Sequence, residues 1–140
     1  MNENKLKHLE FIQNVVTRIN TNSFQIKSLS ITVVSAFLGV YASNKNLEFI
    51  IIAIVPCFLF WSLDTYYLQL ERKFRKLYED VSGVSEKPIV TKLFEMSPHK
   101  YKGGQLRFIS VFFSATIWPL YSSMIFGLII FYKYLSYSNG

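Results

Sequence analysis

The chain contains few of the residues on which enzyme chemistry and disulfide frameworks depend. Of its 140 residues one is a cysteine, Cys57, and two are histidines, His8 and His99, on different segments. A lone cysteine cannot form an intrachain disulfide, so we interpret Cys57 as a small apolar filler. No residue cluster has the spacing of a metal site, and no glycine-rich phosphate loop occurs. The sequence therefore predicts a protein that is not an enzyme and needs no metal or cofactor.

Charge is also absent from long stretches of the sequence. Residues 28–44 and 108–132 carry no charge, and residues 49–70 carry only Asp64. A helix that crosses a bilayer needs about 20 apolar residues, because hydrocarbon offers its backbone no hydrogen-bond partners. We therefore expect an all-α integral membrane protein with about three transmembrane helices, an N-terminal amphipathic helix and a cytosolic extension of the second span.

These stretches divide the chain into four segments. We expect an amphipathic cytosolic helix at 1–25, a two-helix transmembrane hairpin at 26–66, a cytosolic helix with a basic loop at 67–107, and a third transmembrane helix at 108–135. Pro119 lies near the middle of the third apolar run, where it would kink the helix by removing a backbone hydrogen bond. The alternative is an interfacial half, Phe108–Trp118, followed by a shorter span from Leu120.

Basic residues predict the orientation of these spans. Residues 65–107 contain nine lysines and arginines, whereas the turn at 43–46 contains only Lys45 and the end of the chain only Lys133. Loops rich in lysine and arginine stay in the cytoplasm. We therefore expect a multi-pass protein of the bacterial inner (plasma) membrane, with a cytoplasmic N-terminus and an outer C-terminus. The polar start of the chain predicts no cleavable signal peptide.

Two apolar patterns flank the predicted hairpin. Residues 6–19 repeat apolar side chains at helical spacing, and we expect this helix to end at the poor helix formers of 20–23. It either lies on the membrane surface or packs on a neighbouring helix. The cytosolic extension of the second span is expected to end at Gly83. It carries a heptad seam, which would be buried against this helix or a second subunit. The seam residues are Tyr67, Leu70, Phe74, Leu77 and Val81.

The first predicted span carries small and hydroxylated residues on one face, which we call the hydroxyl stripe. Such residues let helices approach closely and hydrogen-bond across the contact. The stripe is therefore either a packing seam or, in a homo-oligomer, the lining of a water-filled pore. Its members are Ser28, Thr32, Ser35, Gly39 and Ser43.

Asp64 is the only acid within the apolar runs, and ionisable residues at such positions are costly and often functional. Trp61 and Tyr66 flank it, and aromatic residues of this kind gather at bilayer interfaces. We therefore place Asp64 at the cytoplasmic rim, with Lys27 as its partner. The alternative is a gate or a position on an ion path.

A basic group follows the second span and continues through the predicted loop. It is expected to contact anionic lipid, since each such charge near an anionic surface is worth about 1 kcal/mol. The alternative is an anionic ligand such as a nucleotide signal, bound with the loop at 97–104. Nucleic acid is not an expected partner, because acidic side chains alternate with these basic side chains along the sequence. The group comprises Arg72, Lys73, Arg75, Lys76, Lys100, Lys102 and Arg107.

The layout of about residues 1–80 resembles the two-span SLATT type of membrane protein, which is associated with bacterial nucleotide-signalling defence systems. The third apolar run departs from that two-span pattern, and no functional residue is carried over. The likeness implies a pore-forming or membrane-disrupting effector that a partner activates on infection. The residues that carry it are His8–Gln13, Asn22–Phe24, Phe60–Asp64 and Glu71–Tyr78.

Taken together, these patterns predict an effector that oligomerises and permeabilises or depolarises the inner membrane in anti-phage defence. The expected partners are the lipid bilayer, further copies of the chain, and a cytosolic defence protein or nucleotide signal. Two alternatives stay open. One is a membrane anchor or scaffold that recruits a soluble partner, and the other is a small ion-coupling transport subunit that uses Asp64.

Overall fold

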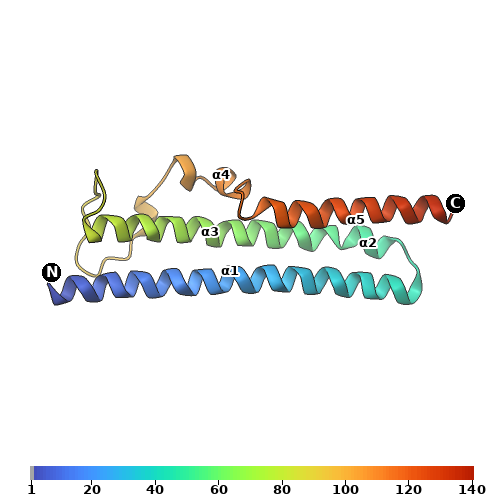
Figure 1. Cartoon of the computed structure of the whole chain (residues 1–140), viewed down its shortest axis with the longest axis horizontal. Coiled ribbons are helices and arrows are strands. Elements are labelled where there is room, and N and C mark those ends of the chain that lie inside the picture. The colour runs from blue at the N-terminus through green and yellow to red at the C-terminus, as the bar shows by residue number, and fades with distance from the viewer. Residues whose placement is uncertain (1) are drawn as a thin grey trace. The chain divides into compact units, whose positions relative to one another are not determined.

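A computed structural model of the protein describes residues 2–140, and this part of the chain is helical without a strand, which confirms the all-α prediction (Figure 1). Two helical stretches, Glu3–Asn44 and Glu48–Ser82, are long and apolar enough to cross a membrane. Insertion and the number of spans stay predictions. The elements are α1 (Glu3–Asn44), α2 (Glu48–Ile52), α3 (Ile54–Ser82), the 3-10 turns η1 (Pro98–Lys100) and η2 (Gly104–Leu106), α4 (Phe108–Phe112) and α5 (Trp118–Ser138).

Helix α1 is longer than the sequence pattern suggested. We expected a break at 20–23, but the helix continues through these residues to Asn44. The Thr21 hydroxyl donates to the carbonyl oxygen of Thr17 at 3.1 Å, so this side chain bonds its own helix instead of capping a new one. Poor helix formers cost only about 0.7 kcal/mol each or less, which the packing of α1 on either side of this run outweighs.

Helix α3 runs without interruption from the second apolar stretch into the charged one and ends where Gly83 was expected to end it. Gly83 adopts φ 88°, which a side chain would disfavour. The backbone N–H groups of Gly83 and Val84 both donate to the carbonyl oxygen of Glu79 at 3.1 Å. These bonds satisfy a carbonyl that the helix end would otherwise leave without a partner.

The third apolar run differs from the single kinked helix expected over 108–135. It forms the short helix α4 and, after a break, the helix α5 from Trp118. Pro119 therefore lies in the first turn of α5. A proline is tolerated there because the first N–H groups of a helix have no partner within the helix.

The chain forms two compact units, and α1 and α3 contribute to both. The first unit comprises residues 1–23 and 66–111. In its core the apolar face of α1 packs on the heptad seam of α3, and Tyr101 from the loop completes it. Phe74 and Leu77 of the seam are thus buried within one chain, and Tyr67, Leu70 and Val81 are partly buried beside them. The buried members of this core are Ile12, Val16, Ile19, Phe74, Leu77 and Tyr101, flanked by Val15, Tyr67, Leu70, Val81, Met96 and Leu106.

The second unit comprises residues 24–65 and 112–140. Trp61 organises its interior: the indole stacks on Phe112 at 4.2 Å between ring centroids and on Tyr121 at 6.1 Å. The Trp61 indole N–H also donates to the Phe112 carbonyl at 2.9 Å. Tyr41 on α1 meets Phe131 on α5 edge to face. Cys57 is buried in this unit.

Candidate functional site

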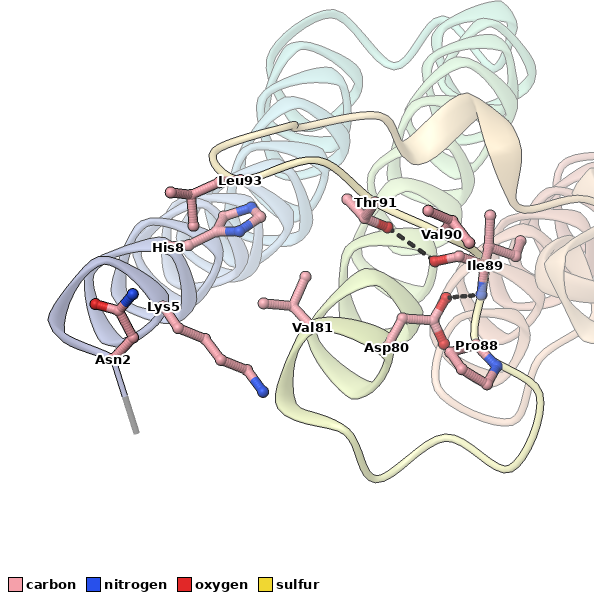
Figure 2. A pocket seen from close by; sticks show the side chains of 10 residues that line it. All are labelled: Asn2, Lys5, His8, Asp80, Val81, Pro88, Ile89, Val90, Thr91 and Leu93. Carbon is pink, nitrogen blue, oxygen red and sulfur yellow. Dashed lines mark hydrogen bonds between the residues drawn. The ribbon is translucent and has the colours of Figure 1, made fainter.

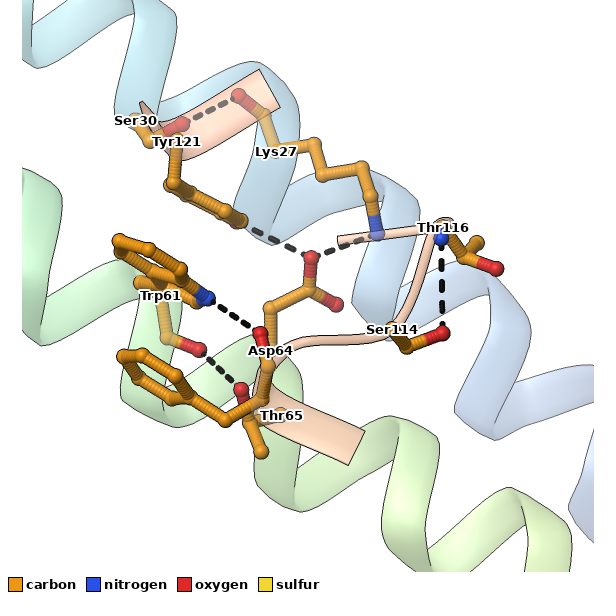
Figure 3. A network of polar contacts seen from close by, with 9 residues as sticks. Lys27, Ser30, Trp61, Asp64, Thr65, Ser114, Thr116 and Tyr121 are labelled. Carbon is orange, nitrogen blue, oxygen red and sulfur yellow. Dashed lines mark hydrogen bonds and ion pairs between the residues drawn. The ribbon is translucent and has the colours of Figure 1, made fainter. Parts of the chain in front are cut away.

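The most buried polar cluster of the second unit is built around Asp64, which is completely inaccessible to solvent (Figure 3). Its Oδ2 atom lies 2.5 Å from Lys27 Nζ and accepts a hydrogen bond from the Tyr121 hydroxyl at 3.1 Å. Lys27 comes from α1, Asp64 from α3 and Tyr121 from α5. The cluster therefore ties three helices together through one carboxylate.

The hydroxyl groups beside this carboxylate are bonded to their own helices. The buried Ser30 hydroxyl donates to the Lys27 carbonyl at 2.7 Å, and the buried Thr65 hydroxyl donates to the Trp61 carbonyl at 2.7 Å. Within residues 2–140, no buried side-chain nitrogen or oxygen lacks a hydrogen-bond partner. Buried polar groups are costly only when they are unpaired, so this hydrogen-bonded cluster can stabilise the packing of the helices.

The geometry bears on the role of Asp64. The structure brings together Asp64 and Lys27, the pair expected at the rim, and adds Tyr121, which the sequence did not single out. Because Asp64 is buried and neutralised by Lys27, it can take up a further cation only if this ion pair opens. The sequence offered one indication for Tyr121: a tyrosine in an apolar run usually finds a hydrogen-bond partner for its hydroxyl when it is buried.

The hydroxyl stripe lies on the surface. All five of its residues are exposed on α1, whereas the buried positions of the same stretch include Ser30, Val34 and Tyr41 on the other side of the helix. A Cβ atom added to Gly39 would meet no atom within 4 Å. The stripe is therefore not a packing seam inside this chain, and it remains available to another molecule or to water.

A second polar site, in the first unit, fastens the loop after α3 to α1. His8 is buried, with 2% of its surface exposed. Its Nε2 atom lies 3.1 Å from the Glu95 carbonyl oxygen, and its Nδ1 atom accepts a hydrogen bond from the Phe94 N–H at 3.3 Å. These partners assign the proton to Nε2. The second bond holds Phe94 at φ 62°, a conformation that is strained for a bulky residue.

The Glu95 carboxylate organises the same loop. Lys100 forms an ion pair with it, and the Lys92 N–H and the Ser97 hydroxyl donate to it at 2.8 Å each. The hydrogen bond from Lys100, followed by those from Lys92 and Ser97, lowers the pKa of Glu95 from 4.5 to about 2. Lys100, expected to contact lipid or ligand, is thus engaged within the protein.

Acidification should loosen this loop. A carboxyl group whose pKa is lowered by folding stabilises the folded form above its ordinary pKa, and this contribution is lost as the pH falls through the folded value. We expect hydrogen-exchange protection of the Lys92 amide to fall between pH 4.5 and about 2 in the wild type. Glu95→Gln should show weaker protection and little change over that range. Glu86→Gln, in the same loop, is the control, and a Glu95→Gln variant whose protection falls with pH as in the wild type would contradict the assignment.

A cavity of about 500 Å³ lies between the start of α1, the end of α3 and this loop (Figure 2). Asp80 on its wall accepts hydrogen bonds from the Ile89 N–H at 3.0 Å and from the Tyr101 hydroxyl at 2.6 Å. Burial and the bond to Asp80 raise the pKa of Tyr101 well above its usual range. The polar groups His8 and Asp80 therefore serve as anchors for the loop. The lining residues are Asn2, Lys5, His8, Asp80, Val81, Pro88, Ile89, Val90, Thr91 and Leu93.

The basic group divides into residues that share a cavity and residues that do not. Arg72, Arg75 and Lys76 line a cavity of about 400 Å³ in the first unit. Lys73, Lys102 and Arg107 do not line it. Within residues 2–140 no group of three or more histidine, cysteine, aspartate or glutamate side chains is placed to hold a metal ion.

Comparison with known proteins adds no assignment to these sites, and the resemblance to the SLATT type stays a prediction. No protein-family model, curated protein or solved structure matches the chain.

Proposed function

We propose that the protein is a membrane effector that oligomerises and permeabilises the bilayer through a water-filled path lined by the hydroxyl stripe of α1. The observation that carries the proposal is the exposure of this stripe on a helix long and apolar enough to cross a membrane. Hydroxyl groups and glycine are little stabilised by contact with lipid hydrocarbon. They favour close contact with another helix or contact with water.

The contacts within the chain are compatible with a path along this face. The Lys27–Asp64 pair and the buried Val34 and Tyr41 hold α1 against its own chain through the other side of the helix. Copies could therefore surround a path lined by the stripe without disturbing the second unit. The Thr32 hydroxyl donates to the Ser28 carbonyl at 3.0 Å and keeps its lone pairs for a partner or water.

The biological setting of the proposal comes from the sequence. We place the protein in the bacterial inner membrane with its N-terminus and residues 65–107 in the cytoplasm, because the basic residues concentrate there. The resemblance to the SLATT type suggests anti-phage defence and activation by a cytosolic partner. A path lined by hydroxyl groups would then depolarise the membrane on activation.

Substitutions at Ser35 test the proposal. Ser35→Leu should abolish most potassium release from expressing cells and leave the oligomer intact on a detergent column, because added apolar bulk dewets a narrow path. Ser35→Ala should keep most of the release, since it adds no bulk. Val40→Leu, at an exposed apolar position off the stripe, is the matched control.

Two results would count against a pore. If Ser35→Leu breaks up the oligomer, the stripe is a contact between helices. If the wild type never permeabilises cells while the expected cytosolic defence partner is active, the effector function should be abandoned.

The second candidate is then a membrane anchor that recruits a soluble protein. The observation that favours it is a set of exposed apolar side chains in the loop of the first unit: Val84, Val90, Leu93 and Phe94. The third candidate, ion coupling through Asp64, would require the Lys27–Asp64 pair to open during transport.

A further inference from the structure

The cavity of about 400 Å³ in the first unit has a strongly basic wall on α3. Arg75 and Lys76 lie three and four residues after Arg72, so the three side chains share one face of the helix. The facing wall is the glycine-containing turn around η2. The full set of lining residues is Arg72, Arg75, Lys76, Glu79, Gly103, Gln105 and Leu106.

The turn is held against α3 by side chains of that helix. Arg72 Nη1 donates to the Gln105 carbonyl at 3.0 Å, and Gln69 Nε2 donates to the Leu106 carbonyl at 2.8 Å. The Leu106 N–H closes the turn by donating to the Gly103 carbonyl at 3.0 Å. The two walls are thus fixed by hydrogen bonds before any ligand arrives, which reduces the entropic cost of binding.

The glycine positions leave room at the mouth of the cavity. Gly103 and Gly104 have φ values of 86° and 55°, which other residues adopt only at a cost. A Cβ atom at either position would meet nothing within 4 Å. A ligand can therefore approach the backbone of this turn closely.

The charges on the α3 wall favour an anion. Two acids moderate them: Glu79 pairs with Lys76 at 2.8 Å, and Glu71 pairs with Arg75 at 2.6 Å. Glu71 bonds Arg75 through Nε, and the Arg75 side chain is 60% exposed. Guanidinium groups of this kind bind phosphate oxygens through paired hydrogen bonds.

We propose that this cavity binds the phosphate group of a phosphate ester. The headgroup of an anionic phospholipid and a soluble nucleotide share this chemistry. Residues 72–76 lie about 8–15 Å along α3 from Tyr66 and Tyr67, the aromatic pair expected at the membrane interface. This placement, which rests on the proposed orientation, puts the cavity at or just beyond the headgroups, within reach of either source. The site itself does not depend on the proposed pore.

The test uses the full chain in a neutral detergent and two kinds of probe. Adenosine monophosphate and inorganic phosphate are titrated by calorimetry, and phosphatidylglycerol is compared with phosphatidylcholine by native mass spectrometry. The variant Arg75→Lys/Lys76→Gln removes one charge and the guanidinium fork but leaves Glu71 a counter-ion. It should weaken binding about tenfold, the effect of losing charge-assisted hydrogen bonds. Lys87→Gln removes one charge on an exposed loop residue and should change binding less than about twofold.

Each outcome bears on the site. Binding of phosphatidylglycerol alone supports it and identifies a lipid as the source, whereas binding of adenosine monophosphate supports it and identifies a soluble ester. The proposal is overturned if the wild type binds none of the probes. It is equally overturned if Lys87→Gln weakens binding as much as the double variant, since the effect would then come from overall charge.

Discussion

Replacing Asp64 by leucine should lower the free energy of unfolding by up to about 3–5 kcal/mol, because the change leaves the partly buried charge of Lys27 uncompensated. Lys27 loses the carboxylate that lies 2.5 Å from its Nζ atom, and 24% of its side chain is exposed. The buried Tyr121 hydroxyl loses its acceptor as well. Denaturation of the purified protein in detergent, followed by circular dichroism, measures the effect.

A double variant separates the ion pair from the rest of the site. Lys27→Met removes the orphaned charge, so Asp64→Leu/Lys27→Met should be more stable than Asp64→Leu alone. Glu3→Gln breaks an ion pair with Lys7 on the exposed surface of α1 and should cost less than about 1 kcal/mol. If Asp64→Leu costs no more than Glu3→Gln, the cluster does not hold the three helices together.

The second large effect is expected at the heptad seam. Phe74→Asp should cost about 4 kcal/mol or more, because it removes a buried aromatic ring and places a charge among apolar side chains. Phe74 is 8% exposed and faces Ile12, Val16 and Ile19 of α1 in the core of the first unit. Hydrogen exchange should show loss of protection in residues 3–23, with an extent independent of protein concentration.

Independence from concentration is what distinguishes a core within the chain from a contact between copies. Tyr78→Asp is the control, since Tyr78 is 37% exposed on the same helix and should tolerate the charge. If Phe74→Asp changes the oligomer size on a detergent column and leaves exchange in α1 unchanged, the seam lies between subunits.

Features that depend on local sequence could be predicted without the structure. The long uncharged runs predicted helices, because a backbone expected in hydrocarbon must pair its own polar groups. No proline or glycine interrupts residues 57–82, and α3 continues to the glycine that ends it. The apolar faces of α1 and α3 have matching helical spacing, so their contact could be anticipated as one of two alternatives. Lys27 could be named as a partner for Asp64 because both lie at matching ends of adjacent apolar runs.

Features that depend on contacts between distant residues could not be predicted. The run at 20–23 stays helical because packing before and after it outweighs weak propensities. Pro119 begins α5 instead of kinking it, so the structure is closer to the alternative of two segments than to the single kinked helix. Tyr121 joins Asp64 across 57 residues of sequence, and His8 fastens Phe94 across 86. The spacing of residues along a chain carries no information about contacts between residues so far apart in sequence.

The sequence alone thus predicted the helical class and the two helical stretches that are long and apolar enough to cross a membrane, because a backbone expected in hydrocarbon must satisfy its own hydrogen bonds. Tertiary structure decided what each polar residue does. It paired the buried Asp64 with Lys27, because a buried charge needs a counter-charge. It left the hydroxyl stripe on the surface, because α1 packs on its own chain through the opposite face, with Ser30, Val34 and Tyr41.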